Sequence, residues 1–170
     1  MTQPVLVVGA TGILAPAVAE LVAAGHRVLA VARTAADLDA LAGEYGERVR
    51  TLPADGTDPG FVPRVADAVV GRPLAGALLY GPAIDHAGVT GVAGLSAGPV
   101  VHVLTSAASA PGHRLPEPPA GVRRLLLGWH PTGRWHTAAE VSAAAVALWE
   151  AGSEADRVLG VVRPWQERPS

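Results

Sequence analysis

Two glycines, Gly9 and Gly12, stand between the apolar run 5–8 and an alanine-rich segment that begins near Ala15. This spacing suits a phosphate group. Gly9 permits a tight turn, Gly12 leaves room for an anion to approach the backbone, and the unpaired N–H groups of a following helix face that anion. We predict a pyrophosphate-binding turn formed by Gly9, Thr11, Gly12, Ile13 and Leu14. The alternative is a tight strand–helix turn without a ligand.

Composition excludes several other chemistries. The chain has no cysteine, and all 13 of its basic residues are arginine, so neither a thiolate nor a lysine can take part in a reaction. The six histidines show no metal-ligand spacing, and we predict no metal site. Charged residues make up 16% of the chain, its net charge is −2, and no basic cluster is present, which argues against nucleic-acid binding.

Length and hydropathy favour one compact unit. With 170 residues, 49% of them hydrophobic, the chain can bury a sizeable core, and we predict a single domain over residues 1–170. No basic segment precedes the first apolar run, which glycine and proline interrupt. We therefore expect no signal peptide, no membrane span and a cytoplasmic protein.

Apolar runs of strand length alternate with segments of helical pattern. The predicted strands cover 5–8, 26–32, 48–53, 74–80, 99–105, 122–128 and 157–162. One predicted helix begins near Ala15, and the others cover 34–45, 58–71, 85–97 and 137–151. Thr137 and Glu140 have the spacing of a capping box at the start of the last helix. This alternation predicts an α/β fold with a single doubly wound Rossmann-type parallel sheet of about seven strands and helices on both faces.

The succession of motifs resembles the short-chain dehydrogenase/reductase family over nearly the whole chain. The residues that carry the resemblance are Gly9-Ala10-Thr11-Gly12 at the first turn, Ala32-Arg33-Thr34 after the second strand, Ala54-Asp55-Gly56 after the third and Leu104-Thr105-Ser106 after the fifth. The resemblance implies a nicotinamide dinucleotide as cofactor and hydride transfer as the reaction.

In this family the segment after the second strand selects the cofactor, because a carboxylate there binds the ribose of NAD whereas arginine accommodates the 2′-phosphate of NADP. This chain has Arg33 at that place and no acid before Asp37. The resemblance therefore implies NADP(H), the alternative being a solvated Arg33. Asp55 would accept the adenine amino group, or else only form a turn. The other cofactor-binding residues implied are Thr34, Gly56, Tyr80, Gly81 and Thr105.

The chain departs from the family where the catalytic helix is expected. The family's tyrosine and lysine lie four residues apart on a helix between the fifth and sixth strands, but this chain has no lysine, and its only tyrosines are Tyr45 and Tyr80. Four prolines, at positions 111, 116, 118 and 119, interrupt the connecting segment 107–121. Since proline is incompatible with a helix interior, we predict that this helix is missing.

Catalytic groups are expected at the carboxyl ends of the central strands, where a doubly wound sheet opens. Ser106 occupies the place of the family's catalytic serine and would bind a substrate carbonyl, or else is an ordinary loop residue. Tyr80 would supply a phenol near the nicotinamide or pack on the cofactor. His130, after the sixth strand, would deliver a proton or lie solvated in its loop.

The substrate is expected to be a small molecule. Trp129 and Trp135 flank the loop next to the nicotinamide end and would form an apolar wall, to which His86 would add a polar group. The alternative for both tryptophans is coverage of the core edge. A homodimer is expected because dimers are the most frequent soluble oligomers.

Three function classes remain open at this point. The first is an NADPH-dependent oxidoreductase that acts on an activated acceptor such as an iminium or an enone. The second is a non-redox isomerase or cyclase that retains the cofactor fold. The third is a dinucleotide-binding sensor without catalysis.

Overall fold

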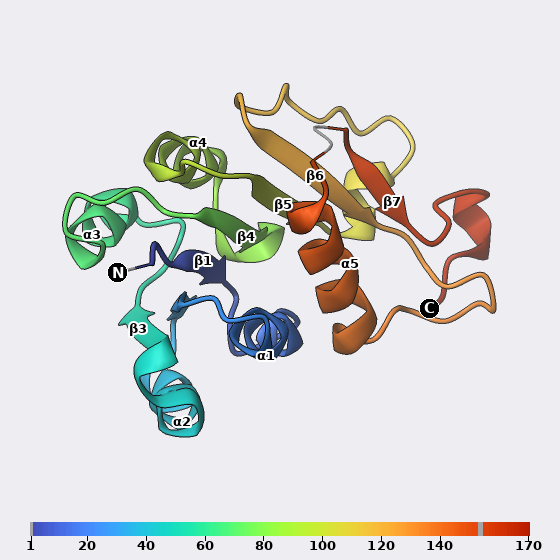
Figure 1. The fold of residues 1–170 in the computed structure, drawn as a ribbon. Coiled ribbons are helices and arrows are strands. Elements are labelled where there is room, and N and C mark those ends of the chain that lie inside the picture. Colours follow the sequence, from blue (N-terminus) through green and yellow to red (C-terminus); the bar gives the residue numbers. More distant parts are fainter. Residues whose placement is uncertain (1, 153–154) are drawn as a thin grey trace.

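The computed structural model describes residues 2–152 and 155–170, in which seven strands form one parallel sheet (Figure 1). The strands are β1 (Val5–Val8), β2 (Val28–Ala32), β3 (Val49–Pro53), β4 (Gly76–Tyr80), β5 (Val100–Leu104), β6 (Val122–Leu127) and β7 (Arg157–Leu159). Their order in the sheet is β3-β2-β1-β4-β5-β6-β7. The winding reverses between β1 and β4, and this is the point where open α/β sheets bind ligands. The predicted fold class is confirmed.

Helices cover both faces of the sheet (Figure 1). They are α1 (Ala15–Ala23), α2 (Ala35–Tyr45), α3 (Phe61–Ala68), α4 (His86–Leu95) and α5 (Ala138–Glu150). α1 and α5 pack side by side on one face, and α3 and α4 lie on the other. Within the part of the chain that the structure describes, no helix combines the length and apolar character needed to cross a bilayer.

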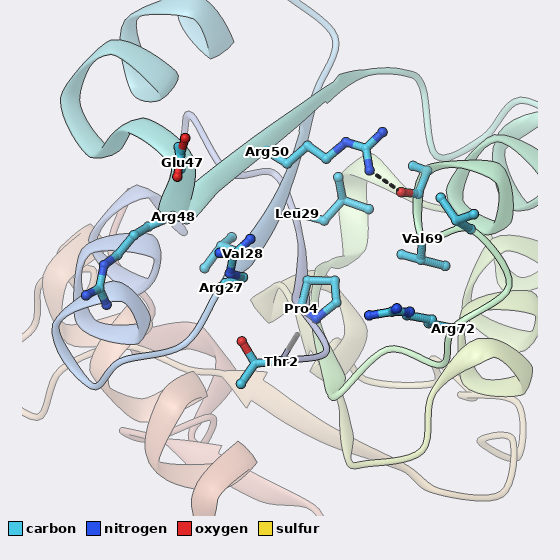
Figure 2. A pocket seen from close by; sticks show the side chains of 12 residues that line it. Thr2, Pro4, Arg27, Val28, Leu29, Glu47, Arg48, Arg50, Val69 and Arg72 are labelled. Carbon is cyan, nitrogen blue, oxygen red and sulfur yellow. Dashed lines mark hydrogen bonds between the residues drawn. The ribbon is translucent and has the colours of Figure 1, made fainter.

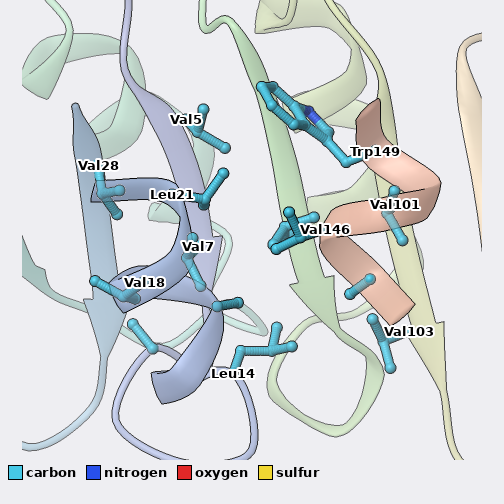
Figure 3. Packing of buried hydrophobic residues seen from close by; sticks show 14 of the residues in the cluster. Val5, Val7, Leu14, Val18, Leu21, Val28, Val101, Val103, Val146 and Trp149 are labelled. Atoms are coloured by element: carbon cyan, nitrogen blue, oxygen red, sulfur yellow. The ribbon is translucent and has the colours of Figure 1, made fainter. Parts of the chain in front are cut away.

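Two apolar cores lie on opposite faces of the central strands. Val5 and Val7 of β1 belong to the core under α1 and α5, whereas Leu6 and Val8 belong to the core under α3 and α4. Successive side chains of a strand point to opposite faces, so a strand covered on both sides must be apolar throughout. Figure 3 shows the first core, in which Trp149 of α5 closes the end of the cluster.

The β5–β6 connection holds no α-helix, as its prolines predicted. A short 3₁₀ helix, Ser106–Ser109, follows β5, and the rest of the connection has no regular secondary structure. Arg124 of β6 attaches this segment to the sheet, because its Nη1 donates to the Pro116 carbonyl (3.1 Å). The same guanidinium forms an ion pair with Asp156 (2.7 Å). Two other side chains lie on the same face of the sheet as Arg124: His102 of β5, which is only partly buried, and Val158 of β7, which is 52% exposed.

The predicted elements are longer than the observed ones at several ends. The helix predicted over 58–71 ends at Ala68, because Val70 and Gly71 both adopt positive φ (52° and 68°). The strand predicted over 157–162 ends at Leu159, since Gly160 has φ 78° and turns the chain. Val161 then forms an isolated antiparallel bridge with Trp129.

Candidate functional site

The turn after β1 has the backbone geometry of an anion cradle. Gly9 has φ 90°, and a Cβ there would lie 2.9 Å from Tyr80 Cβ, so only glycine fits. A Cβ on Gly12 would find no atom closer than the Gly9 carbonyl oxygen at 3.9 Å, which means that the space above Gly12 is open. No side chain of a residue that the structure describes caps the start of α1. Among the hydrogen bonds of the described residues, the amides of Thr11, Ile13 and Leu14 donate to no acceptor.

A groove of about 330 Å³ opens above this turn. We call it the glycine-turn groove. Its side chains come from the carboxyl ends of β1, β2, β3 and β4, which parallel pairing brings to one edge of the sheet. Of the predicted cofactor-binding residues, those on its lining are Gly9, Thr11, Gly12, Ile13, Arg33, Thr34, Asp55 and Tyr80.

Arg33 and Asp55 place opposite charges at the β2–β3 end of the groove. The Oδ1 atom of Asp55 accepts hydrogen bonds from the Thr57 amide (2.9 Å) and the Thr57 hydroxyl (2.8 Å). These bonds, with a smaller contribution from the positive charge of Arg33, lower the pKa of Asp55. Asp55 is therefore an oriented anion whose second oxygen is available to a ligand. Within residues 2–152 and 155–170, Arg33 takes part in no ion pair, and its guanidinium is available to a phosphate.

A second cavity of about 240 Å³ adjoins the groove. We call it the distal cavity. It is lined by Ile13, Tyr80, Thr105, Ser106, Leu127, Gly128, Trp135, His136 and Val141. Ile13 and Tyr80 line both spaces, so the two cavities meet at these side chains.

Ser106 and Tyr80 bring hydroxyl groups to the distal cavity from neighbouring strands. Ser106 begins the 3₁₀ helix after β5, and its carbonyl accepts a hydrogen bond from the Ser109 hydroxyl (2.8 Å), which fixes the turn. In the described part of the chain the hydroxyl groups of Ser106 and Tyr80 are in no hydrogen bond. Both groups can therefore orient a polar ligand.

His136 is the titratable cavity residue that sequence reasoning missed. Its side chain is 6% exposed, and its Nδ1 lies 3.3 Å from Glu140 Oε2, within ion-pair range but without the alignment of a hydrogen bond. Glu140 also accepts two hydrogen bonds from Arg134 (2.9 and 2.8 Å) and one from the Thr137 amide (2.8 Å). The bonds from Arg134, followed by that from Thr137, lower the pKa of Glu140 far below its usual range. The carboxylate is thus a fixed anion beside the imidazole.

The capping box contained a signal for this residue. His136 directly precedes the N-cap Thr137 and lies four residues before Glu140, and the structure confirms the capping box between these two residues. The capping box therefore holds the residue that precedes the N-cap close to the Glu140 carboxylate. The same helix supports the glycine turn, because the Ser142 hydroxyl donates to the Ile13 carbonyl (2.8 Å).

Four of the predicted cofactor-binding residues lie elsewhere than on the groove. Gly56 and Gly81 permit close packing, since a Cβ would lie 2.3 Å from the Ala83 carbonyl oxygen at Gly56 and 2.9 Å from the Val103 carbonyl oxygen at Gly81. Leu14 is fully buried, so only its amide can face a ligand. Thr105 lines the distal cavity.

Three further candidates lie outside both linings. The Nδ1 atom of His130 is hydrogen-bonded to the Thr132 hydroxyl (2.7 Å), and its ring packs against that of His136 with centroids 5.7 Å apart. Trp129 is 3% exposed and packs edge-on against Trp135, whereas Trp135 is 41% exposed at the cavity. His86 is the exposed first residue of α4. Of the two tryptophans, only Trp135 can therefore touch a ligand in the cavity.

Comparisons with known proteins establish the fold. No family model matches the sequence, and no curated protein matches it either. Among solved structures, a carbonyl reductase from Pseudomonas aeruginosa PAO1 in complex with NADP is 19% identical, with a TM-score of 0.68 over 100% of this chain and 99% of that chain. A short-chain dehydrogenase from Streptomyces avermitilis is 16% identical (TM-score 0.68, 94% and 88% covered). An oxidoreductase of the short-chain dehydrogenase/reductase family from Burkholderia thailandensis is 20% identical (TM-score 0.65, 95% and 91% covered). The predicted resemblance is confirmed at the level of the fold.

Proposed function

We propose that this chain is an NADP(H)-dependent oxidoreductase of the short-chain dehydrogenase/reductase type that acts on an activated small-molecule acceptor, such as an iminium or an enone. The observation that carries the proposal is the junction of two cavities at Ile13 and Tyr80. One cavity has a phosphate cradle, and the other has polar side chains. The NADP complex of a reductase with the same fold supports the choice of cofactor.

The glycine-turn groove fits a nicotinamide dinucleotide phosphate. The open space above Gly12 and the unpaired amides of the turn suit a pyrophosphate, which would also cap α1. Arg33 would hold the 2′-phosphate, because a guanidinium binds phosphate oxygens in pairs. Asp55 would accept the adenine amino group through its free oxygen. Bound NADPH would supply a hydride at the distal cavity.

The side chains available in the distal cavity favour activated acceptors over plain ketones. Hydride addition to a plain ketone develops an alkoxide that must be protonated, and the family's tyrosine–lysine pair is missing here. An iminium carbon is already positive, so hydride transfer neutralises it. Ser106 and Tyr80 would orient such a substrate, and Trp135 would cover its apolar side. Both ring nitrogens of His136 are buried, so this residue, beside the Glu140 anion, would donate a proton to an enone only after its imidazole turns into the cavity.

A non-redox isomerase or cyclase is the second candidate, and the pairing of His136 with Glu140 favours it. A carboxylate beside an imidazole is an arrangement that general acid–base catalysis uses without any hydride transfer. Such an enzyme would convert its substrate with no change in the amount of NADPH.

The test is a panel assay that follows NADPH oxidation with cyclic imines, enones and simple ketones. We expect turnover of imines or enones and little turnover of ketones. The matched control is Gly12→Val, which fills the space above the turn and should leave the fold intact, because a Cβ there would meet no atom closer than the Gly9 carbonyl oxygen at 3.9 Å. Product formation without NADPH oxidation would favour the isomerase or cyclase. Tight NADPH binding without oxidation by any acceptor would contradict the oxidoreductase and favour the non-redox enzyme or the sensor.

A further inference from the structure

A third cavity, of about 310 Å³, lies at the opposite edge of the sheet from the glycine-turn groove. We call it the arginine groove. It is formed where β1, β2 and β3 begin and where α3 ends (Figure 2). Its floor is apolar and includes Pro4, Leu29 and Val69. Leu29 and Val69 belong to the core under α3 and α4, so an apolar ligand here would extend that core.

The rim of the arginine groove carries uncompensated positive charge. Arg27, Arg48, Arg50 and Arg72 line it together with a single acid, Glu47, although the whole chain has a net charge of −2. None of these arginines is in an ion pair within the residues that the structure describes.

The side chains of three of the rim arginines are available to a ligand. In Figure 2, Arg50 and Arg72 lie on the α3 side of the groove, whereas Arg48 extends away from it. Arg50 donates one hydrogen bond to the Ala68 carbonyl (2.5 Å), and the side chains of Arg27 and Arg72 donate none among the described residues.

Val70 adds a strained apolar side chain to the same rim. It has φ 52° and is 77% exposed. A β-branched residue rarely adopts positive φ. Because Val70 is exposed, no hydrophobic burial of its side chain offsets the backbone strain. Strained residues of this kind concentrate at ligand-binding sites. Val70 lines the arginine groove next to Val69, where a bound apolar group would cover it.

We propose that the arginine groove binds a small molecule with an apolar body and a carboxylate or phosphate group. The guanidinium groups of Arg27, Arg50 and Arg72 would bind the anionic oxygens, because guanidinium matches both groups in geometry. The apolar body would lie on Pro4 and Val69 and under Val70. This site is separate from the glycine-turn groove, since its residues come from the amino ends of the strands.

The experiment titrates the ¹⁵N-labelled full chain with 1-naphthyl phosphate and with 1-naphthoate, and follows backbone amide shifts. The neutral probe 1-naphthol has the same apolar body. Each titration is repeated with saturating NADPH. The test variant is Arg27→Gln/Arg72→Gln, which removes two guanidinium groups that form no hydrogen bond or ion pair with any other described residue. The matched control, Arg114→Gln/Arg157→Gln, removes two exposed arginines elsewhere.

We expect a charged probe to shift the amides of Leu29, Val69 and Val70 equally with and without NADPH. Its affinity should fall at least tenfold in the test variant and stay unchanged in the control. The charged probe that binds with the higher affinity then identifies the preferred anionic group, phosphate or carboxylate. Equal affinity for 1-naphthol, an equal loss in the control, or shifts confined to the glycine turn and abolished by NADPH would each overturn the proposal.

Discussion

His102 should make the stability of this protein fall between neutral pH and about pH 4. The side chain lies on β5, and its Nε2 has no hydrogen-bond partner among the described residues. Burial lowers its pKa from 6.5 to about 4, and the charges of Arg124 and His86 contribute in the same direction. The folded protein therefore disfavours the protonated imidazole, whereas the unfolded chain accepts a proton near pH 6.5.

The sign and size of the effect follow from this difference. Below pH 6.5 the unfolded chain binds more protons than the folded one, so the contribution of His102 to the free energy of unfolding is complete above pH 6.5 and is lost as pH falls towards the folded pKa of about 4. At about 1.4 kcal/mol for each pH unit, the complete loss is about 3 kcal/mol, and about 2 kcal/mol of it should be reached at pH 5.

Urea unfolding of His102→Leu, followed by tryptophan fluorescence at pH 7.5 and pH 5, tests this value. Leucine removes the titrating group and keeps a side chain of similar size. Between these pH values the variant should lose about 2 kcal/mol less stability than the unmodified chain. His113→Gln, in the exposed proline-rich segment, is the matched control and should behave like the unmodified chain. The same loss in His102→Leu and in the unmodified chain would refute the reasoning.

Four further predictions concern the candidate site. Arg33→Ala should weaken NADPH binding by about 1–3 kcal/mol and leave NADH binding nearly unchanged, and equal calorimetric affinities for both cofactors in the unmodified chain would contradict the NADP assignment. Gly12→Val should abolish dinucleotide binding with an unchanged circular dichroism spectrum, because the new side chain meets open space, and normal binding would move the phosphate site elsewhere. Ser106→Ala should lower kcat about tenfold to a hundredfold through one lost hydrogen bond, and an unaltered kcat would remove Ser106 from the site. His136→Gln should slow enone reduction more than imine reduction, with His113→Gln as control, and an equal effect on both substrates would argue against a proton donor.

The succession of strands along the chain and the glycine turn could be predicted because each depends on neighbouring residues. A strand buried on both faces must be apolar along its whole length, and β1 and β4 both show this pattern. Gly9 and Gly12 follow β1 directly, so the turn, its open space and the start of α1 are encoded within a few residues. The carboxyl-end location of the groove then follows from parallel pairing.

The composition of the distal cavity depends on contacts between distant segments and could not be predicted in the same way. His130 and His136 lie in one loop, and their order along the chain does not indicate which ring lines the cavity. The choice depends on Glu140, which approaches His136, and on Thr132, which holds His130 in its own turn. The burial of Trp129 under Trp135 and Trp165 is also a tertiary effect.

The lack of an α-helix between β5 and β6 and the composition of the distal cavity are connected. Without that helix, the side chains beyond Ser106 come from the segment between β6 and α5, which supplies Trp135 and His136. The Thr137–Glu140 capping box holds the end of this segment to α5, and Arg134 binds the same carboxylate. α5 also donates a hydrogen bond to the glycine turn through Ser142. One helix therefore supports both the glycine turn and the imidazole, so if the proposed function holds, a variant that shifts α5 should impair cofactor binding and turnover together.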